Sequence, residues 1–156
     1  MINYCLPIIE SEEAVLWELS RRARADYRFI EIWLDYIEPW RKGLVSELTS
    51  EFGEQLILLF RRIGLGKIRL PFETRAEIMR ELAGTQSYLD LDVSTQGEEL
   101  AFIKKKGLDL KLILSYHNYI ETPSWLTLRR LAHSMRRSRA TAVSYTHLTL
   151  PTIYSV

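Results

Sequence analysis

Several short apolar runs of this 156-residue sequence contain, or end in, side chains that can bind charged groups or move protons. These side chains are Glu31, Asp35, Arg61, Asp90, Asp92 and His117. A buried carboxylate beside an imidazole can orient the ring and keep it basic, which would suit proton transfer near neutral pH. Each residue type also has a structural interpretation. An arginine at the end of a run is often a surface cation, and a histidine there can be a hydrogen-bonded structural residue.

The spacing of the polar side chains within the runs is that of a strand. Glu31, Trp33 and Asp35 would share one face, because successive side chains of a strand point to opposite sides. A later run repeats this spacing with Asp90 and Asp92. Two carboxylates on one strand face predict a role in binding or catalysis.

The elements that must position these side chains alternate along the chain. Apolar runs that predict strands lie at 4–9, 29–36, 55–61, 88–93 and 110–116. Segments of helical periodicity follow them, with predicted N-terminal caps at Ser11, Thr74 with Glu77, Thr95 with Glu98, and Thr122. Helix ends are predicted at Gly53, Gly84 and Gly107. This alternation predicts parallel strands joined by right-handed crossovers, and hence an α/β fold.

In a parallel α/β sheet, functional residues gather at the carboxyl ends of the strands. Glu31, Arg61, Asp90 and His117 can therefore converge on one pocket. The alternation fits either a doubly wound open sheet or part of an eight-stranded barrel, and the pattern alone does not choose between them. No glycine-rich turn follows the first predicted strand, which argues against a dinucleotide site there.

The composition excludes several classes of protein. Lys plus Arg is 21 and Asp plus Glu is 20, so the net charge of +1 gives no sign of nucleic-acid binding. A hydrophobic fraction of 47% predicts a folded globular chain. With Cys5 as the only cysteine, no disulfide within the chain is expected, and a reducing cytoplasm fits best. We also expect neither a signal peptide nor a membrane span.

A longer motif resembles a known enzyme family. The segment Ile113-Leu-Ser-Tyr-His117-Asn-Tyr-Ile-Glu-Thr-Pro123 resembles the fifth-strand signature of type I 3-dehydroquinate dehydratases, in which Ser-Tyr-His-Asp or -Asn precedes Thr-Pro. Three earlier strands are similar in order and spacing, namely Glu31-Ile-Trp-Leu-Asp35, Ile57-Leu-Leu-Phe-Arg61 and Tyr88-Leu-Asp-Leu-Asp92. The resemblance covers about residues 2–143. It implies a partial (β/α)8 TIM barrel with about five βα units and the start of a sixth strand.

The resemblance also implies an activity. Enzymes of this family dehydrate 3-dehydroquinate to 3-dehydroshikimate in the shikimate pathway of aromatic amino acid biosynthesis, through an imine (Schiff base) between a lysine and the substrate ketone. His117 would be the general base and then the acid, Glu31 and Arg61 would bind the substrate, and Asp90 would support the histidine. A small-molecule substrate is implied, with no metal and no diffusible cofactor, and the parent protein could be a homodimer.

Three departures from the family pattern affect this expectation. Trp33 stands where the family usually has arginine, and the loop Ile63-Gly-Leu-Gly66 lacks the usual Glu-Gly-Gly segment. The imine-forming lysine is expected at the position of Ser144, and no lysine follows Lys111. Covalent catalysis would be lost without that lysine, so the chain as written is expected to be inactive.

The end of the sequence differs from the rest in composition. From Ala140 to Val156 there is no Asp, Glu, Lys or Arg. The run from Val143 to Val156 resembles a sequencing-adapter tail, so we expect residues 1–143 to form a truncated barrel domain and residues 144–156 to be a non-native tail. Two alternatives stay open: another sugar- or phosphate-binding TIM-barrel enzyme that works without an imine, and a non-enzymatic α/β module.

Overall fold

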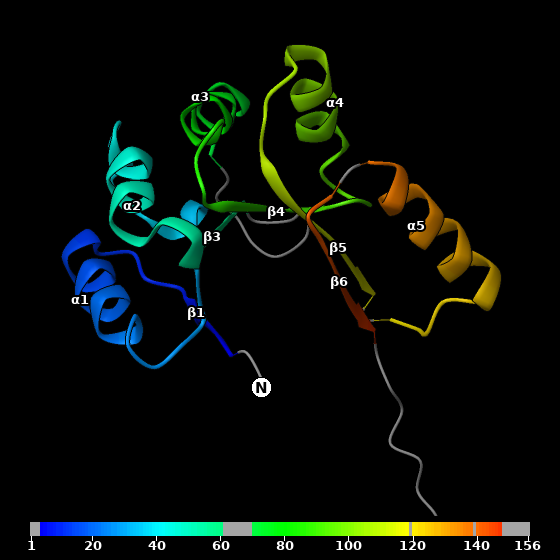
Figure 1. Ribbon diagram of the computed structural model, residues 1–156, viewed down its shortest axis with the longest axis horizontal. Coiled ribbons are helices and arrows are strands. Elements are labelled where there is room, and N and C mark those ends of the chain that lie inside the picture. Colours follow the sequence, from blue (N-terminus) through cyan, green and yellow to red (C-terminus); the bar gives the residue numbers. More distant parts are fainter. Residues whose placement is uncertain (1–3, 61–69, 119, 139, 148–156) are drawn as a thin grey trace, which may run out of the picture.

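All the strands in the described part of the chain run parallel, and their order in the sheet is their order in the sequence. The computed structural model describes residues 4–60, 70–118, 120–138 and 140–147 (Figure 1). The strands are β1 (Cys5–Ile8), β2 (Phe29–Trp33), β3 (Leu56–Leu59), β4 (Tyr88–Asp92), β5 (Lys111–Asn118) and β6 (Ala142–His147). The helices are α1 (Glu13–Ala23), α2 (Leu44–Phe52), α3 (Phe72–Leu82), α4 (Gly97–Lys106) and α5 (Trp125–Arg137), with 3-10 turns η1 (Leu34–Tyr36) and η2 (Gly53–Gln55).

The strand order decides between the two architectures that the sequence left open. A doubly wound sheet reverses its strand order at a switch point, whereas a barrel adds each strand beside the previous one. The order β1-β2-β3-β4-β5-β6 is that of a barrel. Six strands are fewer than the eight that close such a barrel, and the sheet is an open half-barrel with helices along its outer side (Figure 1). The predicted partial TIM barrel is confirmed.

The hydrophobic core lies between the sheet and the helices. Eight side chains of β2 to β5 that face the helices are at most 8% exposed: Ile30, Ile32, Leu56, Leu58, Leu89, Leu91, Leu112 and Leu114. They pack on helix residues such as Leu16 and Leu48, which are fully buried. Burial of these branched apolar side chains against the helices is the main force that holds the layers together.

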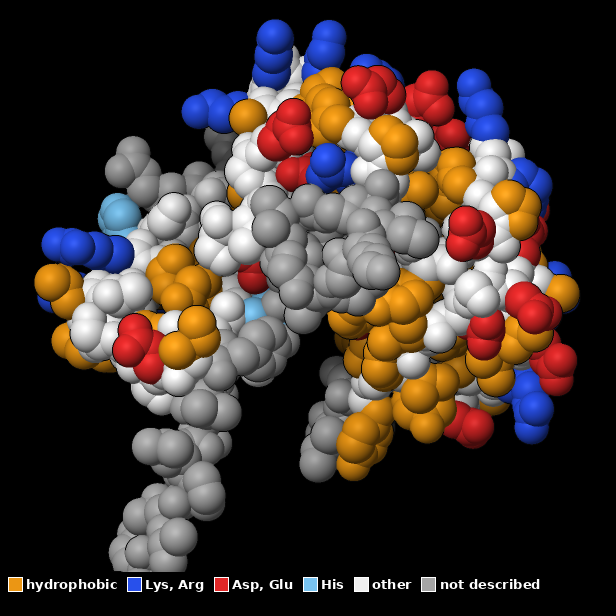
Figure 2. All heavy atoms as spheres, turned by 180° about the vertical axis from the view of Figure 1, so that it is seen from behind, with side chains coloured by type: hydrophobic (Ala, Val, Ile, Leu, Met, Phe, Trp, Pro, Cys, Tyr) orange, Lys and Arg blue, Asp and Glu red, His pale blue; other side chains and the backbone are white. Residues whose placement is uncertain are grey.

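The alternate strand positions point to the other side of the sheet, which we call the inner face. Paired residues of neighbouring parallel strands face the same way, and the pairs Glu31–Ile57, Leu59–Asp90, Asp92–Ser115 and Ser115–Ser144 extend this face across the sheet. Figure 2 shows the molecule from behind, with a hollow between its N-terminal half and the end formed by β6. On β2, Glu31 and Trp33 of the inner face are only partly buried, whereas Ile30 and Ile32 of the opposite face are fully buried.

Two predicted strands differ from the expectation. The run at 4–9 predicts a strand buried on both faces, yet Cys5 and Pro7 are exposed because β1 is an edge strand. The second strand ends at Trp33, and the chain turns into η1, so Asp35 does not share the strand face of Glu31. Asp35 is instead buried, and its Oδ1 accepts a hydrogen bond from the backbone N–H of Leu70 at 2.8 Å.

The helix ends were easier to predict than the helix starts. The residues that precede α1, α3, α4 and α5 are Glu12, Pro71, Gln96 and Ser124, and not the predicted caps Ser11, Thr74, Thr95 and Thr122. Ser124 does accept a hydrogen bond from the N–H of Thr127 at 3.3 Å. Gly53 and Gly107 end α2 and α4 with φ angles of 52° and 61°, which glycine adopts readily.

Strand β6 contains the first residues of the expected tail. It pairs with β5 from Ala142 to His147, and Tyr145 stacks on Tyr116 with ring centroids 5.8 Å apart. The division into residues 1–143 and 144–156 stays a prediction, because strand pairing does not report the origin of a segment. Among the described helices, none has the length and apolar character needed to cross a membrane.

Candidate active site

His117 lies near the carboxyl end of β5 and contacts a carboxylate of the neighbouring strand. Its Nδ1 is 3.2 Å from Oδ2 of Asp92, the last residue of β4. The histidine side chain is 15% exposed and the aspartate side chain 1%. The sequence predicted a carboxylate beside the imidazole and named Asp90 for this support; in the structure, Asp92 is the carboxylate in contact with Nδ1 of His117.

The carboxylate of Asp92 is held on its other side by the turn that follows β4. Oδ1 accepts hydrogen bonds from the backbone N–H groups of Ser94 and Thr95, at 2.9 and 3.1 Å, and from both of their hydroxyls. Burial alone raises the pKa of Asp92, but the hydrogen bonds from His117, Ser94 and Thr95 outweigh it and hold this pKa well below its usual range. Asp92 is therefore ionised at neutral pH.

An ionised Asp92 determines the state of the neutral imidazole. A carboxylate only accepts hydrogen bonds, so Nδ1 of His117 carries the proton and donates it to Oδ2. The unprotonated nitrogen is then Nε2. A ring in this state can take a proton at Nε2 and return it, which is the requirement for general acid–base catalysis.

Glu31 lies on the inner face of β2 and contacts the residue two positions later. The indole N–H of Trp33 donates to Oε1 of Glu31 at 2.8 Å, and the Trp33 ring meets Tyr36 edge-on at 5.9 Å. The pKa of the Cys5 thiol is raised to about 11 by partial burial and by the negative charges of Glu31 and Asp90. Both carboxylates thus act on one thiol, as expected if they share one side of the sheet.

The predicted site residues can now be placed. Glu31, Asp90, His117 and Ser144 have register positions on the inner face. Arg61 and most of the loop that follows it lie outside the described residues. The roles assigned to Glu31, Arg61, Asp90 and His117 stay predictions.

Asp92 was predicted only as one of two carboxylates on a strand face, and the family resemblance implied no individual role for it. A signal was available in Asp92-Val-Ser94-Thr95, because an aspartate followed by serine and threonine is typical of a turn in which the carboxylate binds the next backbone N–H groups. Thr95 was interpreted as the N-terminal cap of the next helix. In the structure, Thr95 donates to Asp92 instead.

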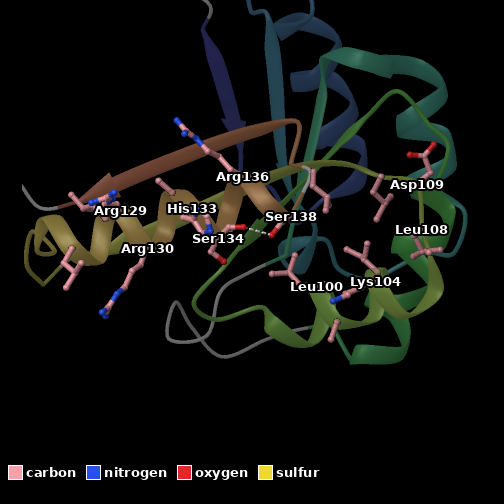
Figure 3. A pocket seen from close by; sticks show the side chains of 18 of the residues that line it. Leu100, Lys104, Leu108, Asp109, Arg129, Arg130, His133, Ser134, Arg136 and Ser138 are labelled. Atoms are coloured by element: carbon pink, nitrogen blue, oxygen red, sulfur yellow. Dashed lines mark hydrogen bonds between the residues drawn. The ribbon is translucent and has the colours of Figure 1, made fainter.

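A cavity on the helical side of the molecule does not include these residues. In the parts of the chain that the structure describes, no group of three or more His, Cys, Asp or Glu side chains could hold a metal ion. A cavity of about 1960 Å³ lies between α4 and α5, with Arg129 and His133 on one wall and Leu100 and Lys104 on the other (Figure 3). His117 does not line it. This cavity is on the outer, helical side and is not the candidate active site.

Parallel strands in sequential order, with helices along the outer side, place the described part of the chain in the class of (β/α)8-barrel folds. The profile of the family described as type I 3-dehydroquinase matches residues 4–144. The chain belongs to the type I 3-dehydroquinase family.

Curated relatives are 3-dehydroquinate dehydratases from bacteria and an archaeon. The protein of Coxiella burnetii (strain RSA 493 / Nine Mile phase I) is 31% identical over 112 residues, which cover 69% of this chain and 46% of the relative. The protein of Lactococcus lactis subsp. lactis (strain IL1403) is 29% identical over 136 residues, covering 80% of this chain and 56% of the relative. The chain thus spans about half the length of these relatives.

Solved structures share the fold. The type I 3-dehydroquinate dehydratase of Clostridium difficile, with covalently modified comenic acid, has a TM-score of 0.71 at 20% identity and covers 92% of this chain and 62% of its own. The 3-dehydroquinate dehydratase of Aquifex aeolicus VF5 has a TM-score of 0.70 at 23% identity, with coverages of 93% and 66%. At these identities the likeness establishes the architecture alone.

Proposed function

We propose that this chain carries the acid–base part of a 3-dehydroquinate dehydratase site, which acts in the dehydration of 3-dehydroquinate to 3-dehydroshikimate. The observation that carries this proposal is the pairing of β5 with β6. His117 pairs with Thr146, and Ser144 lies two residues earlier on the same inner face. A lysine at position 144 would therefore extend toward the face on which His117 stands.

The proposed reaction uses His117 twice. With the substrate ketone joined to a lysine as an imine, Nε2 of His117 removes a proton from the carbon next to the imine carbon. The electron pair of that C–H bond moves toward the imine, and an enamine forms. The C–O bond of the leaving hydroxyl then breaks as His117 returns its proton to the oxygen, and water departs. The histidine ends in the state in which it began.

The other residues have binding roles in this proposal. Glu31 would accept hydrogen bonds from substrate hydroxyls, and Arg61 would bind the substrate carboxylate. Asp90 would support the histidine side of the site. The single cysteine and the small polar substrate support a cytoplasmic setting.

The same proposal predicts that the chain as written is inactive. A serine hydroxyl at position 144 cannot form an imine with a ketone, because imine formation requires a primary amine. We therefore propose that the chain as written lacks covalent catalysis, and that residues 144–156 are not native to the barrel formed by residues 1–143.

The test introduces the missing amine. Ser144→Lys is incubated with 3-dehydroquinate and sodium borohydride, which reduces an imine to a stable amine, and the protein is analysed by mass spectrometry. We expect a mass increase equal to one reduced substrate adduct, located at residue 144, and no adduct in the unchanged chain.

Val143→Lys is the matched control. Val143 pairs with Leu114, is 54% exposed and lies on the opposite face of the same strand. A lysine there adds the same amine one residue away but outside the site, so no adduct is expected. A folded Ser144→Lys variant without an adduct, or equal labelling of both variants, would contradict the proposed function.

A further inference from the structure

We propose that Asp92 is the positioning residue of His117, and that it fixes the ring tautomer in which Nδ1 carries the proton and Nε2 is the basic nitrogen. The catalytic value of this role rests on the proposed function, whereas the contact and the tautomer do not. Asp92 does not touch substrate in this proposal and acts through the histidine alone.

The backbone of Asp92 is anchored to the neighbouring strand end. Its N–H donates to Oε1 of Gln96 at 2.7 Å, and Nε2 of Gln96 donates to the carbonyl oxygen of Phe60 at 3.4 Å. Gln96 is 1% exposed. The N–H of Val93 donates to the carbonyl of Ser115 at 2.9 Å, which continues the β4–β5 pairing past the end of β4. The residue that carries the carboxylate is thus tied to both neighbouring strands.

The side chain of Asp92 is fixed as firmly as its backbone. Donors from Ser94 and Thr95 converge on Oδ1, and a rotation of the carboxylate would break several of these hydrogen bonds at once. Oδ2 is the oxygen that meets Nδ1 of His117. The two oxygens therefore have different tasks: one holds the carboxylate in place and the other holds the imidazole.

The register explains why Asp92 makes this contact when Asp90 was the predicted support. On β5, Asp92 is level with Ser115 and Asp90 is level with Ile113. A strand rises about 3.3 Å per residue, so the level of Asp92 is roughly 7 Å from that of His117 and the level of Asp90 roughly 13 Å. A short aspartate side chain can bridge the first separation with the help of the histidine side chain.

The same geometry predicts what Asp92→Asn does. The amide oxygen must take the place of Oδ1, because that place is surrounded by donors from Ser94 and Thr95. The amide NH2 then occupies the place of Oδ2 and donates to Nδ1 of His117. Nδ1 becomes an acceptor and the proton moves to Nε2, which removes the base without removing the ring. This inversion of the tautomer is the signature of a positioning role.

The experiment reads the tautomer directly in the chain as it exists. Protein labelled with 15N at histidine is examined by NMR at a pH where the ring is neutral, with His117 assigned by comparison with His117→Gln. We expect the unchanged chain to show the proton on Nδ1, Asp92→Asn to show it on Nε2, and Asp92→Glu to restore Nδ1. Asp26→Asn, at an exposed aspartate that follows α1, is the control and should leave the tautomer unchanged.

The possible outcomes separate this inference from the proposed function. A proton on Nε2 in the unchanged chain would overturn the inference without any variant, so the test does not depend on the folding of Asp92→Asn. A proton that stays on Nδ1 in folded Asp92→Asn would overturn it as well. If the tautomer behaves as expected while Ser144→Lys forms no imine, the positioning role stands and the proposed function fails.

Discussion

Trp33 donates its indole N–H to the carboxylate of Glu31 across 2.8 Å, and both side chains come from the same face of β2. Trp33 stands where the family pattern usually has arginine, and Glu31 is one of the predicted substrate-binding residues. The hydrogen bond therefore links the two. Tyr36 packs edge-on against the Trp33 ring and limits its movement. Glu31 is therefore held by an aromatic donor, which adds no positive charge to the inner face.

Trp33→Phe should destabilise the protein modestly. The change removes the indole donor and leaves Glu31 without that hydrogen bond, and a net loss of about 0.5–1.5 kcal/mol is expected. The free energy of unfolding from urea titration measures it. Trp125→Phe is the control, since Trp125 is 76% exposed and its replacement should change stability little. Equal losses in both variants would contradict a specific role of the Trp33–Glu31 hydrogen bond.

Asp92 should make the free energy of unfolding depend on pH in the acidic range. Although burial opposes its ionisation, the pKa of Asp92 is lower in the folded protein than in the unfolded chain, because hydrogen bonds from His117, Ser94 and Thr95 favour the ionised carboxylate. The unfolded chain therefore takes up the proton first as the pH falls. The stabilisation is fully present well above pH 4 and is lost progressively below about pH 4. Urea titrations of the unchanged chain and Asp92→Asn between pH 7 and pH 3 check this.

The difference in free energy of unfolding between the two proteins should shrink as the pH is lowered through that range. Surface carboxylates such as Glu13 and Glu47, which bind Arg41, are present in both proteins and cancel in the comparison. A difference that is constant from pH 7 to pH 3 would show that Asp92 gains no stabilisation from being ionised in the fold.

The two faces of β3 should respond differently to the same substitution. Leu58 is completely buried against the helices, and Leu58→Ala should cost about 2–5 kcal/mol through lost burial and the cavity left behind. Leu59, the next residue, is only partly buried on the inner face, and Leu59→Ala should cost less. Chemical denaturation of both variants measures the difference. A larger loss at Leu59 would argue against the placement of the core.

Tyr145 should contribute to stability through its stacking on Tyr116. The rings are nearly parallel, with an angle of 5° between them, and such aromatic pairs contribute about 0.5–1.5 kcal/mol beyond burial. We expect Tyr145→Ala to lower the thermal midpoint and Tyr145→Phe to leave it nearly unchanged. If Tyr145→Ala melts at the same temperature as the unchanged chain, this stack contributes nothing to stability.

Much of the fold could be read from the sequence because each strand is a short apolar run between helical segments. The run of Ile57, Leu58 and Leu59 predicts a strand from hydrophobicity alone, and the alternation predicts parallel pairing. The choice of a barrel required either the family resemblance or the observed strand order, since both architectures have the same local pattern. Strand ends such as Trp33 depended on tertiary contacts, in this case on the burial of Asp35 against Leu70.

The candidate site was predictable in part for similar reasons. Glu31, Asp90 and His117 are polar residues within apolar runs, and their period of two predicts the face on which they lie. Which carboxylate reaches the histidine depends on the register between β4 and β5, and no spacing within one strand reports this register. Asp92 was therefore not predicted as the residue that contacts His117.

The two edges of the sheet differ in their ability to accept another strand. Pro7 lies within β1 and has no backbone N–H, so that edge cannot form a complete ladder of hydrogen bonds. Strand β6 contains neither proline nor a Lys, Arg, Asp or Glu residue, and its Val143 and Tyr145 are favourable in β-structure. A seventh strand, whether from further chain or from another molecule, is therefore expected to pair with β6 and not with β1.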